Sequence, residues 1–286
     1  MGVRRRCLPA GWYPGTAHGV RDAVQGMLGA SPPPRGAVAG VAPHAGWEFS
    51  GALACAVFAS LAEDLDTIVI IGGHLAPSDA ILCASEAEYE TPLGNVPADL
   101  ELVSRLKEIL PITEDRWADN TVEVQLPFAR QFFPEARCLG MRAPPSAKAG
   151  ELGRAIAESA RSAGSRVAVV GSTDLTHYGP NYGFAPMGSG ARAVEWVKNV
   201  NDRRFVEALL AMDEAGAVAR ATGEHSACSA GGAVAAMAFA RAAGAARGEL
   251  LEYRTSRDVH RLGREGSERP SESFVGYAAV VYRKEA

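Results

Sequence analysis

The strongest constraint on the fold of this 286-residue chain is a regular alternation of short apolar runs with longer segments of helical periodicity. The run DTIVIIGG at 66–73 is rich in β-branched residues and ends in two glycines, which is typical of a strand buried on both faces. Similar runs, each predicted to form a strand, stand at 37–42, 137–143 and 166–172. Strands that alternate with helices indicate an α/β fold whose sheet is largely parallel in its first half. Right-handed crossovers bring the carboxyl ends of such strands to one edge, where ligands bind.

Helices are predicted between and after these strands, and two further strands close the chain. Ser50 is expected to cap the first helix through its hydroxyl, and Pro127 marks a start, an end or a kink in the third. The predicted helices cover 51–64, 98–110, 120–133, 147–163, 191–212 and 229–246, and the closing strands cover 249–255 and 273–283. We therefore predict one α/β domain over residues 1–286, with a central, mostly parallel or mixed sheet flanked by helices. The loop-like stretches at 31–36 and 261–273 do not divide it.

Composition and charge exclude several classes of protein. The net charge is −4 and no basic stripe follows the arginines at 4–6, which argues against a nucleic-acid surface. The longest apolar segment, 227–240, is 14 residues long and ends at Arg241, so a membrane span is not expected. No apolar stretch follows the charged N-terminus, and the five cysteines are widely spaced without a C-x-x-C pair. These features predict a reduced, cytoplasmic protein.

Three of the six histidines occupy the same position relative to predicted strands. His44 and His74 follow the first two strands, and His177 follows the strand at 166–172 after a short turn. The chain has no P-loop, no H-E-x-x-H and no G-x-S-x-G motif, so polar residues at strand ends are left to carry any chemistry. A single histidine of this kind is more often a hydrogen-bonded loop residue. Three together favour a metal site, since neutral imidazole is the commonest protein ligand for metals.

Asp174 and His177 are three residues apart just beyond a strand. At this spacing the carboxylate can accept from one ring nitrogen and leave the other facing a substrate as an acid or base. Alternatively, Asp174 ties down the turn as an Asx-type cap and His177 lies at its rim.

Cys228 stands at the predicted start of the alanine-rich helix at 229–246. The helix dipole there is expected to lower the pKa of a thiol and to favour the thiolate, which is the ligand form. Glu224 and His225 are two further donors in the same segment. The alternative is that Cys228 is a small buried hydrophobic residue, as free cysteines usually are.

Several motifs together resemble one family, the Memo family, whose bacterial and archaeal members are called AmmeMemoRadiSam system protein B. The most specific evidence for this resemblance is a combination of motifs that occur together: PHAGWEFSG, ETPLGNVPAD with VEVQLPF, and STDLTHYG. The matching stretches occur in the same order along nearly the whole chain, at 11–15, 43–51, 71–74, 90–99, 122–128, 172–179 and 274–282, together with the Cys228 segment.

The resemblance implies a fold similar to that of class III, LigB-like extradiol dioxygenases, which hold Fe(II) with two histidines and a carboxylate. His44 and His74 match the two histidine-ligand positions, and Cys228 falls where the family has cysteine in place of the glutamate. Asp174 and His177 match the remaining site pair, with His177 at the acid/base position. A thiolate ligand softens the site, so copper and zinc compete with iron.

Three departures from the family pattern fall around the ligands and leave the ligands themselves intact. Gly73 precedes His74 without the family's usual proline, Asn120 stands where a histidine is common, and Ser229 follows Cys228 where glycine is usual. These positions belong to the expected substrate pocket.

Two functions of different classes follow. The first is a metal-dependent oxidoreductase, with iron or copper as the expected metal and zinc as a further candidate, acting on a small, phenol-like substrate. The alternative is a non-catalytic metal-binding or partner-binding scaffold, as eukaryotic relatives suggest. The resemblance also implies AMMECR1-like and radical-SAM proteins as partners, and neither a nucleic acid nor a membrane is expected.

Overall fold

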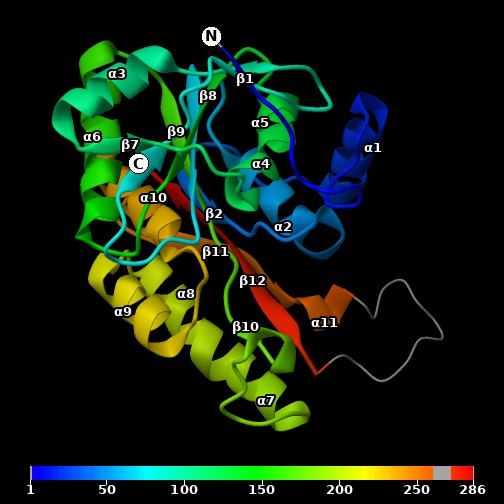
Figure 1. Cartoon of the computed structure of the whole chain (residues 1–286). Helices are drawn as coiled ribbons and strands as arrows, with labels where there is room; N and C mark the ends of the chain where they lie inside the picture. Colours follow the sequence, from blue (N-terminus) through cyan, green and yellow to red (C-terminus); the bar gives the residue numbers. More distant parts are fainter. Residues whose placement is uncertain (1, 260–271, 286) are drawn as a thin grey trace.

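The computed structural model describes residues 2–259 and 272–285 (Figure 1). The predicted loop at 261–273 therefore lies, apart from its last two residues, outside the described part of the chain. Among the described residues, no helix is long and apolar enough to cross a membrane.

A nine-stranded mixed sheet forms the centre of the fold (Figure 1). Its strand order is β10-β12-β2-β9-β3-β8-β4-β7, and β11 pairs with β12. The four predicted strands of the first half are parallel neighbours: β2 (Ala37–Ala42), β3 (Thr67–Gly72), β8 (Arg137–Arg142) and β9 (Val167–Ser172). The closing strand β12 runs antiparallel to β2, and β4 runs antiparallel to β8. This confirms the predicted α/β class with a central mixed sheet.

The other strands of the two sheets are mostly short. A separate three-stranded sheet has the order β1-β5-β6, so the N-terminal strand pairs with a segment more than eighty residues away. The bounds are β1 (Val3–Arg4), β4 (Ile81–Cys83), β5 (Glu88–Tyr89), β6 (Val96–Pro97), β7 (Ile112–Glu114), β10 (His177–Tyr178), β11 (Gly248–Thr255) and β12 (Phe274–Arg283). The sequence patterns do not predict β1, β4, β5, β6, β7 or β10, because runs of two or three residues carry no readable periodicity.

Helices cover both faces of the central sheet (Figure 1). One face packs against α3 (Leu100–Ile109), α6 (Ala147–Ala163), α8 (Asp202–Leu210), α9 (Glu214–Glu224) and α10 (Ala230–Ala242). The other face packs against α1 (Ala17–Leu28), α2 (Trp47–Ser60) and α5 (Leu126–Phe132). The remaining helical segments are α4 (Asn120–Glu123), η1 (Pro180–Tyr182), α7 (Ala191–Trp196), η2 (Val197–Asn201) and α11 (Ser256–Val259). In β3, Ile68 and Ile70 face one layer while Val69 and Ile71 face the other, so both faces are buried.

The predicted cap of the first helix after β2 is wrong. Helix α2 begins at Trp47, three residues before Ser50, and Gly46 is its N-cap. The backbone N–H of Trp47 donates to the carbonyl of Trp12 at 2.7 Å, so a distant segment satisfies a donor that a local cap would otherwise serve. The Ser50 hydroxyl instead donates back to the carbonyl of Ala45 at 3.2 Å.

Two predicted helices are interrupted. The segment 120–133 divides into α4 and α5, and Pro127 lies in the first turn of α5, where its missing N–H costs nothing. The segment 191–212 is helical to Leu210, but the five residues of η2 in its middle are a π-helix.

The N-terminal end of α10 lies so close to the strand ends that no side chain fits between the two backbones. A Cβ atom on Gly232 would lie 2.0 Å from the carbonyl oxygen of Ile71, and one on Gly231 would lie 2.0 Å from that of Ala143. On the sheet side, a Cβ on Gly171 would lie 2.5 Å from the carbonyl oxygen of Gly232. Glycine at these positions therefore places the start of α10, with Cys228 just before it, directly over the carboxyl ends of β3, β8 and β9.

A buried carboxyl group holds the loop that follows β9 through hydrogen bonds. Asp202, at the start of α8, accepts from the backbone N–H of Thr176 at 3.0 Å and from its hydroxyl, and also from the Tyr253 hydroxyl at 2.7 Å. The backbone of Gly276 in β12 donates to the carbonyl of Thr176 at 3.0 Å. Burial raises the pKa of Asp202 to about 6, although its hydrogen bonds lower it.

Gly232→Ala tests the close approach of α10. We expect it to lower the free energy of unfolding by about 2 kcal/mol or more, because the added methyl group overlaps a backbone carbonyl that cannot move freely. Gly223→Ala in α9 is the matched control, since a Cβ there has no heavy atom within 4 Å and alanine favours helix by up to about 1 kcal/mol. Urea titration of both variants measures the difference, and equal stability would contradict the account.

Asp202→Asn tests the buried carboxyl group. Because the pKa of Asp202 is raised in the folded chain, the stabilisation from its proton is complete at low pH and is lost as the pH rises through about 6. The asparagine variant lacks this loss, so its stability relative to the wild type should increase by about 2 kcal/mol between pH 4 and pH 7. Denaturant titrations at several pH values measure this, and parallel pH profiles would show that the carboxyl group ionises as freely as an exposed one.

Candidate metal centre

The structure brings His44, His74 and Cys228 together at the carboxyl edge of the sheet. The Sγ atom of Cys228 lies 3.3 Å from Nε2 of His44. The ring of His74 stands nearly perpendicular to that of His44, with the ring centroids 5.1 Å apart. One donor atom from each residue lies within 4.8 Å of the other two. Two of the three donors follow β2 and β3 and the third precedes α10, as the sequence analysis expects.

His44 is held rigidly behind Pro43. Its side chain is only 2% exposed, and its backbone N–H donates to Oδ1 of Asp174 at 2.7 Å. Its carbonyl accepts from the Asn120 side chain at 3.3 Å, and Nδ1 lies 3.4 Å from the Ser172 hydroxyl. Burial lowers the pKa of His44, and the nearby Asp174 carboxylate only partly offsets this. The imidazole is therefore neutral near pH 7, which is the form that binds a metal.

Cys228 is tied to the loop after β9. Its backbone N–H donates to the carbonyl of Asp174 at 3.2 Å, and the backbone N–H of Ser229 donates to the Thr173 hydroxyl at 3.0 Å. The hydroxyl of Ser229 also donates to the carbonyl of Gly73 at 3.0 Å, beside His74. Hydrogen bonds of 3.0 to 3.2 Å therefore connect the cysteine segment to the loop after β9 and to the end of β3.

The predicted lowering of the Cys228 pKa by the helix dipole is wrong. Burial raises the pKa of this thiol well above its ordinary value, and the Asp174 carboxylate raises it further. Both effects outweigh the favourable position at the start of α10. A metal ion that binds here has to displace the thiol proton, as a coordinated thiol is deprotonated.

Asp174 lies between the two imidazoles of His44 and His177. Its Oδ2 atom is 3.8 Å from Nε2 of each ring, which is too long for a hydrogen bond. Burial alone would raise the pKa of Asp174, but both imidazoles and the backbone N–H of His44 lower it by more. The carboxyl group is therefore ionised. Its hydrogen bond with the backbone of His44 joins the loop after β9 to the loop after β2. Asp174 is therefore not the local Asx cap of the alternative interpretation.

His177 lies at the rim of the centre with an unused ring nitrogen. Its Nε2 atom is buried and makes no hydrogen bond within the described part of the chain. Its ring packs against Tyr182 with the centroids 4.9 Å apart. A donor atom of His177 also lies within 4.8 Å of donors from Asp174 and Cys228, so the thiol belongs to two overlapping groups of potential ligands.

Glu224 and His225 do not join the centre. Glu224 pairs with Arg220 at 2.5 Å, and the ring of His225 packs against Phe184 with the centroids 5.0 Å apart. His225 ends α9 in the left-handed region, with φ of 51°, and it is in neither group of potential ligands among the described residues.

The centre opens into a cavity of about 800 Å³. Its polar side holds His44, His74, Asp174, His177 and Asn120. The lining also includes aromatic and apolar side chains, among them Trp12, Phe49, Tyr182, Val275 and Tyr277. A cavity of this size and lining fits a small organic molecule.

The sequence analysis misses one acidic residue of this region. Asp119 Oδ2 lies 3.5 Å from Nδ1 of His74 and accepts from Nη1 of Arg142 at 3.3 Å. An aspartate directly before the helical segment that starts at Asn120 is a recognisable N-cap signal, and Asp119 does accept from the backbone N–H of Thr121 at 2.8 Å. That signal predicts the cap but not the contact with a histidine 45 positions earlier.

A family model described as Memo-like protein matches residues 5–281. A MEMO1 family protein of Thermococcus onnurineus is 32% identical over 99% of this chain and 100% of its own length. The MEMO1 family proteins PF1638 of Pyrococcus furiosus and TK1477 of Thermococcus kodakarensis are 31% and 34% identical, covering 99% and 86% of this chain and 99% and 87% of their own.

Among solved structures, the uncharacterized protein JW3007 from Escherichia coli K12 is 15% identical, covers 85% of this chain and 98% of its own, and superposes with a TM-score of 0.47. The match of the family model along nearly the whole length, together with relatives more than 30% identical over nearly all of the chain, shows that this chain belongs to the Memo family.

Proposed function

We propose that this protein is a metal-dependent oxidoreductase that holds iron or copper through His44, His74 and Cys228 and acts on a small, phenol-like substrate. Zinc is a further candidate for the metal. The observation that carries the proposal is the contact of 3.3 Å between a buried imidazole and a thiol, beside a second imidazole, where both imidazoles line a cavity.

The donor set fits a metal ion. Nitrogen and sulfur ligands bound at about 2.0 and 2.3 Å around a tetrahedral ion are about 3.5 Å apart. The observed 3.3 Å between His44 Nε2 and Cys228 Sγ is close to this separation. Three protein donors leave at least one position open toward the cavity, which is typical of a catalytic rather than a structural site. Two imidazoles with one thiolate suit copper and zinc at least as well as iron.

A bound metal of this kind supplies Lewis acidity and, if it is iron or copper, one-electron chemistry. The protein supplies the proton transfer. His177 Nε2 is buried and makes no hydrogen bond within the described residues, so it can accept a proton from a substrate hydroxyl in the cavity and return it later. The ionised Asp174, whose Oδ2 lies 3.8 Å from that nitrogen, stabilises the imidazolium while His177 holds the proton.

The shape of the cavity supports an aromatic substrate. Trp12, Phe49 and Tyr277 line the same cavity as the polar donors, and Tyr182 packs against the ring of His177. Aromatic side chains of this kind suit a flat phenolic ring, whose hydroxyl group could be met by His177. The association with AMMECR1-like and radical-SAM proteins stays a prediction from the family resemblance.

Removal of either a histidine or the thiol ligand should empty the centre. We expect anaerobically purified wild-type protein to contain stoichiometric metal by elemental analysis, and His44→Ala and Cys228→Ser to lose most of it. His18→Ala and Cys7→Ser are the matched controls, because both residues are exposed and lie outside the donor cluster. Equal metal content in all five proteins would refute the proposed ligands.

Removal of the acid/base group should slow turnover and leave the metal in place. We expect His177→Ala to retain stoichiometric metal and to lose about 10²-fold or more in oxygen consumption with a panel of phenols and catechols. If metal-loaded wild-type protein neither consumes oxygen nor alters any of these substrates, the catalytic proposal fails and the non-catalytic metal-binding alternative replaces it.

A further inference from the structure

We propose that Asp119 is the positioning residue of His74, and that its carboxylate holds Nδ1 of the ring so that Nε2 faces His44 and Cys228. This inference rests on the proposed metal centre and names the group that orients its most exposed ligand.

His74 needs an external support more than the other two donors. Its side chain is 42% exposed, whereas that of His44 is 2% exposed. It follows Gly73, whose φ of +107° lies in a region that favours glycine, so the backbone alone does not fix the direction of the ring. An exposed ring that is free to rotate loses conformational entropy when it binds a metal.

The contact with Asp119 selects one ring nitrogen. Oδ2 of Asp119 lies 3.5 Å from Nδ1 of His74, and a small rotation of the ring makes this a hydrogen bond. With its proton held at Nδ1, the imidazole presents Nε2 as the lone pair for a metal. Carboxylate partners of this kind fix the tautomer and orientation of metal-binding histidines and raise their basicity.

Asp119 is itself held in place. Oδ1 accepts from the backbone N–H of Thr121 at 2.8 Å and from its hydroxyl. The Thr121 hydroxyl oxygen also accepts from the backbone N–H of Gly73 at 3.0 Å. A Cβ on Gly72 would lie 2.2 Å from this oxygen, so the end of β3 and the start of α4 are in direct contact. The first turn of α4 therefore supports both the backbone and the ring of the His74 segment.

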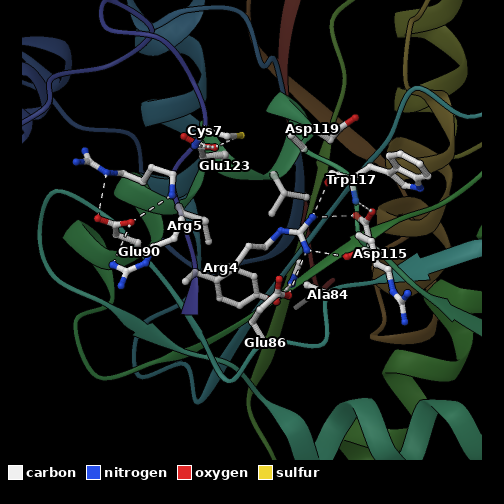
Figure 2. A pocket seen from close by; sticks show the side chains of 17 residues that line it. Arg4, Arg5, Cys7, Ala84, Glu86, Glu90, Asp115, Trp117, Asp119 and Glu123 are labelled. Atoms are coloured by element: carbon white, nitrogen blue, oxygen red, sulfur yellow. Dashed lines mark hydrogen bonds and ion pairs between the residues drawn. The ribbon is translucent and has the colours of Figure 1, made fainter. Parts of the chain in front are cut away.

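A buried arginine connects this support to the N-terminal strand. Arg142 donates to Oδ2 of Asp119 and forms a two-point ion pair with Asp115, with distances of 2.9 and 2.7 Å. Arg4 of β1 lies 3.4 Å from Asp115 and donates to the carbonyl of Trp117 at 2.6 Å (Figure 2). Arg4 also pairs with Glu86 at 3.2 Å. Loss of the Asp119 charge leaves Arg142 paired with Asp115, so a variant at 119 does not strand a buried cation.

Asp119→Asn isolates the contact with His74. Asparagine is as good an N-cap as aspartate, and its Oδ1 atom can still accept from Thr121. Its amide nitrogen replaces Oδ2 and presents N–H to the ring nitrogen, so the support of His74 is lost while the cap is kept. We expect the variant to bind Co(II) about 10- to 100-fold more weakly than the wild type in anaerobic titrations of the full-length protein. The thiolate-to-cobalt charge-transfer band should persist because Cys228 is unchanged, and Asp119→Glu should recover part of the affinity.

Asp99→Asn is the matched control. Asp99 is another buried aspartate that caps a helix, since it accepts from the backbone N–H of Leu102 at 3.0 Å at the start of α3, and it is not part of the donor cluster. Its asparagine variant should bind Co(II) as the wild type does. Wild-type affinity in Asp119→Asn, or an equal loss in Asp99→Asn, would overturn the positioning role.

The same titration separates this inference from the metal centre on which it rests. If the wild type shows no stoichiometric Co(II) binding with a thiolate charge-transfer band, or if His44→Ala binds as tightly as the wild type, the proposed centre is wrong. If the wild type binds and His44→Ala does not, an unchanged Asp119→Asn removes only the role of Asp119.

Discussion

The close approach of α10 to the strand ends is the constraint on which the rest of the site depends. Gly231 and Gly232 let the helix backbone lie against the carbonyl groups of Ala143 and Ile71 without an intervening side chain. Because of this contact, Cys228 reaches a histidine that is 184 positions earlier in the chain. The alanine-rich composition of the helix follows from the same constraint, since small side chains allow α10 to pack closely on both the sheet and α6.

Asp174 organises the charges around this centre. One oxygen accepts from the backbone of His44, and the other lies between the rings of His44 and His177. Burial raises the pKa of Cys228 and the carboxylate raises it further, so the thiol is protonated unless a cation displaces the proton. The negative charge would therefore have two effects on the proposed centre: it would favour a cation in the cavity, and ligation by the thiol would depend on that cation. The buried Asp202 fixes the loop that carries both Asp174 and His177.

The parts of the structure that repeat a strong local pattern are predictable from sequence. The long apolar strands β2, β3 and β9 and the helix α6 end within a residue or so of their predicted limits, and the placement of His44 and His74 after strands follows directly.

The start of α2 is not predictable, because its first donor is satisfied by Trp12 from a distant segment. The rise in the Cys228 pKa is missed because burial and a neighbouring carboxylate are tertiary effects that outweigh the local dipole. Asp119 reads locally as a helix cap, and its second contact appears only in three dimensions. The prediction of one domain and the assigned roles of the site residues stay predictions.

X-ray absorption at the metal K-edge of the loaded wild-type protein tests the central claim most directly, because it reports the elements bound to the metal. The account predicts one sulfur at about 2.3 Å and two imidazole nitrogens at about 2.0 to 2.1 Å. A first coordination sphere of oxygen and nitrogen alone, with no sulfur, would show that Cys228 is not a ligand and would contradict the account.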